Sequence, residues 1–169
     1  MKELKKALLI ITLLFGAVIY TNAQTKVAHI NTQELISSMP EMKVAKSKFD
    51  KLQESLGNDI QASVTKYRNK LTQYKNDAIN KTTAENEARK KELAELERRI
   101  QEAQAAAQKT AEAKYIDLTK PIQEKALAAI QKVARAQGFL YVLDETEGSG
   151  LLLADGTNLM SAVKRELGI

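Results

Sequence analysis

Two long stretches of the chain carry apolar residues at steps of three and four, separated by charged and polar residues. The first stripe consists of Phe49, Leu52, Leu56, Ile60, Val64, Tyr67, Leu71, Tyr74 and Ala78. The second consists of Leu93, Leu96, Ile100, Ala103, Ala107, Ala111, Tyr115, Leu118 and Ile122. This spacing places each set on one face of an α-helix. Good helix formers dominate both stretches, and neither Gly nor Pro occurs between Asn58 and Lys120.

A helix restart separates the two stripes. Thr82 stands three residues ahead of Glu85, the spacing of a capping box. We therefore expect an antiparallel helical hairpin over residues 41–121, with its turn near 80–83; the alternative is one continuous helix in a parallel coiled coil. Each limb of about 39 residues would reach about 58 Å, so the hairpin must project from the rest of the chain. Its second stripe is rich in Ala, which predicts a weakly held, flexible arm.

Short apolar runs flank the arm and predict a small body of strands and helices over residues 24–40 and 122–169. Residues 26–31 read as a strand, Asn31 or Thr32 as the cap of a brief helix, and Pro40 as the start of the arm. A proline at position 121 is expected to interrupt the return limb. The helical pattern then resumes and ends at Gly138.

The C-terminal part of the body contains two dense apolar runs, residues 139–143 and 151–154. Both are of strand length and lack alternation, which favours burial on both faces. The acidic, glycine-containing segment 145–150 would join them as a hairpin loop. Asn158 is expected to cap a final helix that stops at Gly168. The fold class is thus mainly α with a small β body.

The body predicts self-association, because its parts outside the long helices, residues 24–40 and 138–169, total 49 residues and are too few for a robust core. Three apolar strands would leave open edges and exposed surface in a monomer. We therefore expect an obligate homo-oligomer joined at the strands. The residues expected at this interface are Val27, Ile30, Phe139, Tyr141, Leu143, Leu151 and Leu153.

The N-terminus has the pattern of a cleaved secretory signal over residues 1–23. A basic segment precedes a short apolar one, and a plausible cleavage site ends at Ala23. The apolar segment is short for a membrane span, and an uncleaved anchor is the alternative. The sequence has no Cys, so it forms no disulfide and carries no lipid-modified cysteine.

Positive charge gathers on the arm: 20 basic and 14 acidic residues lie between Glu41 and Gly138. The concentration is greatest on the second limb near the turn, at Lys81, Arg89, Lys90, Lys91, Arg98 and Arg99. One interpretation is a solvated face with pairs such as Glu87–Lys91 and Glu95–Arg99. The other is electrostatic contact with acidic proteins or anionic lipid. Nucleic acid is disfavoured, because no binding motif or set of base-stacking aromatics occurs there.

No enzyme, cofactor or metal motif is present. The sequence has one histidine, His29, in a predicted strand, and it contains no phosphate-binding loop or Gly-rich dinucleotide turn. The acidic string at residues 144–148 does not fit a calcium-binding loop. We expect no catalytic activity and no cofactor.

The order of elements resembles the Skp/OmpH family of periplasmic chaperones over residues 24–169. The resemblance rests on the strand KVAHINTQEL, the charged helical hairpin, the run PIQEK from Pro121, the run GFLYVLD from Gly138, and the closing helix. It implies a jellyfish-like homotrimer whose arms enclose a cavity. Such proteins hold unfolded outer-membrane proteins there without ATP, and some also bind lipopolysaccharide. The alternative function is a structural or adaptor coiled-coil protein of the cell envelope.

In a chaperone of this kind, exposed apolar side chains on the arm that the seam does not use are the candidate client contacts. These are Met42, Ala62, Ile79, Ala105, Ala106 and Ala113.

Overall fold

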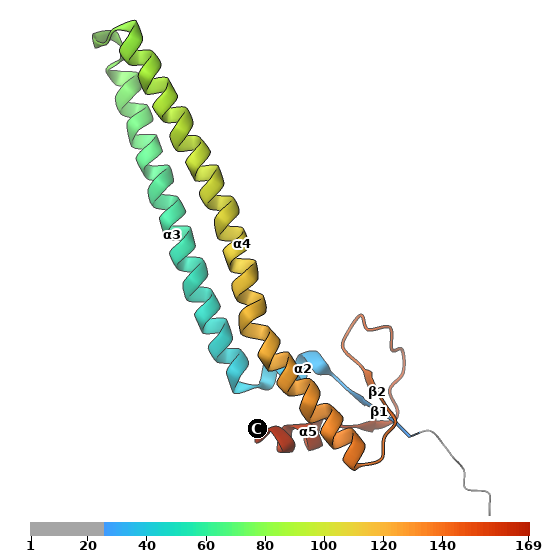
Figure 1. The fold of residues 1–169 in the computed structure, drawn as a ribbon. Coiled ribbons are helices and arrows are strands. Elements are labelled where there is room, and N and C mark those ends of the chain that lie inside the picture. The colour runs from blue at the N-terminus through green and yellow to red at the C-terminus, as the bar shows by residue number, and fades with distance from the viewer. Residues whose placement is uncertain (1–25) are drawn as a thin grey trace, which may run out of the picture.

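The computed structural model describes residues 26–169, so the signal-peptide prediction lies outside the described residues. A long helical arm projects from a small α/β body that holds the chain's C-terminus (Figure 1). In chain order, the body elements before the arm are β1 (Val27–Ile30) and α2 (Thr32–Ser38). The arm is built by α3 (Pro40–Asn76), η1 (Ala78–Asn80) and α4 (Thr83–Ala136). The remaining body elements are β2 (Tyr141–Asp144), β3 (Thr157–Asn158) and α5 (Met160–Leu167).

The arm is the expected antiparallel hairpin, which rules out the single continuous helix. The Thr82 hydroxyl accepts a hydrogen bond from the Glu85 amide at 3.2 Å, and a Glu85 carboxylate oxygen accepts one from the Thr82 amide at 2.9 Å. This reciprocal pair satisfies two of the amides that a helix start leaves free. The 37 residues of α3 span about 56 Å.

The expected interruption at Pro121 is wrong, because α4 runs through this residue without a break. Proline removes one backbone hydrogen bond and is costly inside a helix. Here Thr119 and Ile122 are both buried, so packing on either side of the proline offsets this loss. Gln137 is the C-cap of α4, and Gly138 follows at a φ of 73°, where glycine is favoured.

The three strands form one parallel sheet in the order β2-β1-β3. The expected hairpin between residues 139–143 and 151–154 is therefore wrong, since β2 and β3 each pair with β1. Residues 151–154 form no strand, and Asn158 instead pairs opposite His29. Within the described residues the body contains one short sheet, in which β2 and β3 are the edge strands.

The core lies where the end of α4 meets α2, β1 and α5. Its largest fully buried side chains are Ile30, Leu35, Met39, Leu159 and Val163. The C-terminal part of α4 contributes Ile122, Ala126, Ala129, Ile130, Val133 and Ala134. The end of α4 thus belongs to the body, as expected. Among the described residues, no helix is long and apolar enough to cross a membrane.

Local caps place the short helices as the sequence predicts. Asn31 caps α2 by accepting a hydrogen bond from the Glu34 amide at 2.8 Å. The N-cap of α5 is Leu159 rather than Asn158, but the Asn158 side chain still accepts a hydrogen bond from the Met160 amide at 2.8 Å. Gly168 ends α5 in the left-handed region.

Candidate functional site

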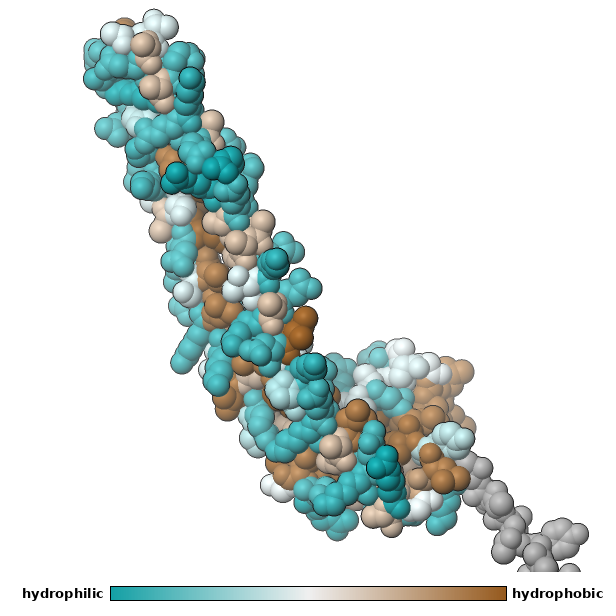
Figure 2. All heavy atoms as spheres, viewed as in Figure 1, coloured by the Kyte–Doolittle hydropathy of each residue, from teal (hydrophilic) through white to brown (hydrophobic). Residues whose placement is uncertain are grey.

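The seam between the two limbs of the arm is thin. Both apolar stripes face each other as expected, and Phe49 and Tyr115 meet edge to face with ring centroids 5.4 Å apart. Within residues 46–118, all of which the structure describes, no side chain is fully buried. Because stabilisation follows the apolar area removed from water, each contact in this seam contributes little. Figure 2 shows a narrow apolar line along the arm, with hydrophilic side chains on both sides.

Near the turn, polar contacts replace the apolar seam. Arg89 donates to Asp77 at 2.8 Å, and its guanidinium lies 4.6 Å from the centroid of the Tyr74 ring. Glu92 accepts hydrogen bonds from Lys70 and Tyr74 across the limbs. The hydrogen bond from Lys70 lowers the pKa of Glu92, and the bond from Arg89 lowers that of Asp77. The apolar periodicity predicted Tyr74 at the seam but gave no signal for the charged members of this cross-limb cluster.

The basic residues expected to bind anions near the turn are mostly paired within the arm. Their partners are Glu85 for Lys81, Asp77 for Arg89, Glu87 for Lys90, Glu95 and Glu102 for Arg98, and Glu95 for Arg99. Glu87 therefore pairs with Lys90 rather than with Lys91. The hydrogen bonds from Arg98 and Arg99 lower the pKa of Glu95 to about 2. Such intramolecular pairs favour the interpretation as a solvated face.

In the part of the chain that the structure describes, unpaired positive charge lies at the base of the arm, as it also does at Lys66 and Lys75 further along α3. Within the described residues, Lys43, Lys46, Lys48 and Lys51 form no ion pair. Of the neighbouring acids, Glu41 is already paired with Lys125 of α4, while Asp50 and Glu54 form no ion pair within the described residues. Sequence counting alone could not distinguish these free lysines from the paired cations near the turn.

The candidate client contacts divide into two groups. Ile79 is 92% exposed beside the turn, and Ala62, Ala105, Ala106 and Ala113 are exposed along the helices. Met42 is half-buried, packs against the core and lines a groove at the arm base. The structure does not bring these six residues together into one patch.

Two grooves lie at the arm base and share Ala45 and Leu118 among their lining residues. The first has a volume of about 470 Å³, and Phe49, Tyr115 and Leu118 form much of its apolar wall. The second, of about 490 Å³, lies beside Pro40, Val44 and Pro121.

The body exposes a broad apolar surface on the single chain. Figure 2 shows apolar side chains gathered over the body. The most exposed large apolar residues in and around β2 and in the loop after it are Leu140, Tyr141, Leu143, Leu152 and Leu153, at 74, 60, 43, 99 and 72%. Phe139 and Leu151 are half-buried, and Val27 is 40% exposed. Ile30, which was expected at the interface, is only 1% exposed. It lies in the chain's own core and is not on the surface of the single chain.

The apolar composition of residues 139–143 and 151–154 predicted that both runs are buried on both faces. The single chain leaves most of their side chains exposed. A groove of about 340 Å³ lies between α4 and β2, with Leu127 and Leu143 among its lining residues. Apolar surface of this extent on one small body is typical of an interface.

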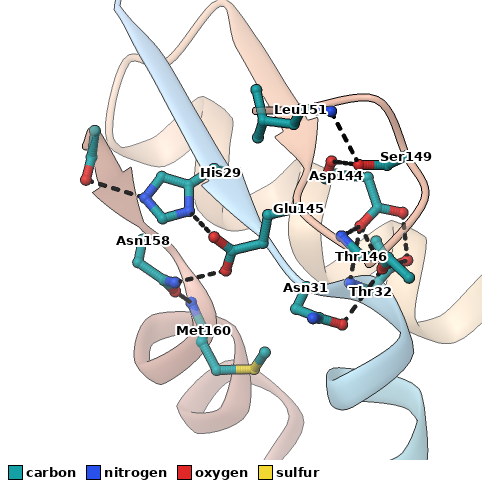
Figure 3. Close-up of polar contacts among 11 residues, drawn as sticks. His29, Asn31, Thr32, Asp144, Glu145, Thr146, Ser149, Leu151, Asn158 and Met160 are labelled. Carbon is teal, nitrogen blue, oxygen red and sulfur yellow. Dashed lines mark hydrogen bonds and ion pairs between the residues drawn. The ribbon is translucent and has the colours of Figure 1, made fainter. Parts of the chain in front are cut away.

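Two polar networks fix the loop that carries the exposed leucines (Figure 3). His29 contacts Glu145 at 2.6 Å and the Gly156 carbonyl at 3.1 Å, while Asn158 donates to Glu145 at 2.9 Å. Asp144 accepts hydrogen bonds from the amide and hydroxyl of Thr32 and from those of Thr146. These contacts join β1, β2, β3 and the start of α2.

The first network accounts for His29 as a structural residue. His29 as a whole is 7% exposed, and both of its ring nitrogens contact groups of the body. Across the described residues there is no cluster of three or more metal-ligating side chains.

Together these features define a class: a small parallel-sheet body with a large apolar surface, from which a charged helical hairpin projects. The model of the family "Outer membrane protein (OmpH-like)" matches residues 26–167. The chain therefore belongs to the OmpH-like family.

A solved structure shares this fold. It is the crystal structure assigned to an outer membrane chaperone (OmpH-like) from Caulobacter crescentus CB15, with a TM-score of 0.73 and 16% sequence identity. The match covers 85% of each chain. No curated protein sequence matches this chain.

Proposed function

We propose that this protein is an ATP-independent holdase chaperone that keeps unfolded outer-membrane β-barrel proteins from aggregating. The observation that carries the proposal is the projecting arm, whose length no function inside a compact body would require. Membership of the OmpH-like family and the likeness to a protein assigned as an outer membrane chaperone support it. It acts without catalysis or a cofactor.

Assembly into a homotrimer through the body is the second part of the proposal. The exposed leucines around β2 and the open edge of that strand support self-association. Three arms projecting from one platform would enclose a cavity. Holding then rests on many weak contacts, which sum through effective concentration when the arms are linked.

The location follows from the clients. We propose that the chain is exported to the periplasm by the N-terminal signal, with cleavage near Ala23. There the arm contacts unfolded chains through exposed residues such as Ile79 and through its free lysines. Anionic lipid or lipopolysaccharide is a further proposed partner of the basic arm, and nucleic acid is not.

Shortening the arm without disturbing the body or the turn tests this function. The contacts Phe49–Tyr115 and Asp77–Arg89 fix the register, so residues 51–68 lie opposite residues 97–114. Deleting both segments removes about five helical turns, or about 27 Å, from each limb and preserves helical phase. The assay is light scattering of an unfolded outer-membrane β-barrel diluted from urea.

The shortened protein is expected to keep the assembled mass of the full chain, measured by multi-angle light scattering, and to lose protection against aggregation. Retained protection would refute the cavity. A monomeric mass for the full chain at micromolar concentration would refute the trimer. Binding to one folded partner, without protection of any unfolded barrel, would identify an adaptor instead.

A further inference from the structure

The first groove at the base of the arm combines an apolar wall with two lysines that form no ion pair within the described residues, whereas Lys125 in the second groove is paired with Glu41. The first groove is defined here by Met42, Lys43, Lys46, Phe49, Gln53 and Tyr115 among its lining residues, with a volume of about 470 Å³. The second groove is also apolar, but it has no aromatic side chain among its lining residues. The aromatic wall and the unpaired lysines make the first groove suited to accept an apolar side chain with neighbouring negative charge.

Charge at the rim selects the kind of occupant. Lys43 and Lys46 lie on the rim and form no ion pair within the described residues, while Asp50 adds one negative charge. Lys48 and Lys51 continue the positive charge along the same helix, again without ion pairs in this part of the chain. The field at the groove is thus net positive and favours an anionic ligand.

Polar groups in the groove favour a polypeptide over a lipid chain. The side chains of Ser37 and Gln53 line the groove and make no hydrogen bond within the described residues. The amides and carbonyls of an extended peptide offer partners to them, whereas an acyl chain would only cover them and leave them without water.

We propose that this groove is an anchoring subsite for an acidic, apolar segment of unfolded polypeptide. An aromatic or long aliphatic side chain would lie against Phe49 and Tyr115, with neighbouring carboxylates beside Lys43 and Lys46. The inference rests on the proposed chaperone function and names the kind of client segment that the arm base takes.

Binding of a defined peptide by the full-length protein tests the subsite. The probe is a labelled peptide of about ten residues, roughly 33 Å when extended, in which acidic residues alternate with tyrosine and leucine. A second peptide carries lysine at every acidic position. Fluorescence anisotropy measures the dissociation constant of each, and the acidic peptide is expected to bind more tightly.

Charge reversal supplies a matched pair of variants. Lys43→Glu with Lys46→Glu alters the rim, whereas Lys66→Glu with Lys75→Glu makes the same change of charge on the same helix far from the groove. All four lysines are exposed and form no ion pair in the described part of the chain, so both variants should fold. The rim variant is expected to bind the acidic peptide about tenfold more weakly, and the control to stay within about twofold.

A tryptophan reporter locates the bound peptide, because the sequence contains no Trp. The emission of Gln53→Trp, inside the groove, should shift on peptide binding, while that of Gln61→Trp, on the exposed surface, should not. Equal loss of binding in both charge variants, or no loss in either, would overturn the subsite. A different outcome is that the Gln53→Trp emission shifts with decanoate, a fatty-acid anion, but not with the peptide. If that shift is lost when Lys43 and Lys46 are changed to Glu, the groove is an amphiphile site and the peptide subsite is wrong.

Protection of an unfolded β-barrel by the wild-type chain separates the two proposals. If protection is present and the rim variant binds the acidic peptide normally, only the subsite is wrong. If wild-type protection is absent, the chaperone function fails and the subsite fails with it.

Discussion

The Asp144 carboxylate makes the stability of the body depend on pH. The loss of unfolding free energy on removing its charge follows from the shift of its pKa. Burial raises the pKa of Asp144, but hydrogen bonds from Thr146 and Thr32 outweigh burial and bring the pKa from 3.8 to about 2. Without screening by solvent, this pKa difference would correspond to roughly 2.4 kcal/mol in the free energy of unfolding. The residue is exposed, so screening by solvent reduces the expected contribution to about 1 kcal/mol.

The direction follows from the lowered pKa. The stabilisation is complete above the unfolded pKa near 3.8 and is lost as the pH falls toward 2. Asp144→Asn should therefore lower the free energy of unfolding by about 1 kcal/mol at neutral pH, and the difference from the wild type should shrink between pH 4 and 2. The control is Asp155→Asn, an equal charge change at an exposed acid of the same body that accepts no hydrogen bond within the described residues.

Urea denaturation at a fixed protomer concentration measures this difference, with Phe139→Trp as a body reporter in every variant. A fixed concentration is needed because association contributes to apparent stability. A difference between wild type and Asp144→Asn that stays constant from pH 6 to pH 2.5 would show that the carboxylate charge does not act as described. So would an equal effect of Asp155→Asn.

Two further predictions concern local stability. Thr82→Ala removes the capping box and should lower the stability of the start of α4 by about 1 kcal/mol. Backbone hydrogen exchange should then become faster beside the turn and stay unchanged in β1. Equal acceleration in both regions would contradict this prediction. Leu35→Ala empties a fully buried core position and should destabilise the body by about 2–5 kcal/mol in urea denaturation. Leu96→Ala, in the half-buried seam, should cost about 1 kcal/mol, and a cost equal to that of Leu35→Ala would refute the thin seam.

The sequence by itself determined the local elements of this protein. The period of the two stripes and the Thr82–Glu85 spacing were enough for the arm and its turn, because helix periodicity and capping depend on residues within a few positions of one another. The same holds for Asn31 before α2, Pro40 at the start of α3 and Gly138 after α4.

Only the tertiary structure decided which distant groups meet. The parallel pairing of β1 with both β2 and β3, and the absence of a strand at 151–154, depend on contacts between residues over 100 positions apart. A dense apolar run is compatible with a strand, with a core or with an exposed interface, so composition could not show that Ile30 is enclosed while Leu152 is bare.

The tertiary structure also decided which charged side chains are paired and which are free. The sequence located the basic residues, but pairing across and along the helices neutralises most of those near the turn and leaves the lysines at the arm base free. Whether a charge is available to a partner depends on atoms within about 4 Å, and the fold alone brings those atoms together.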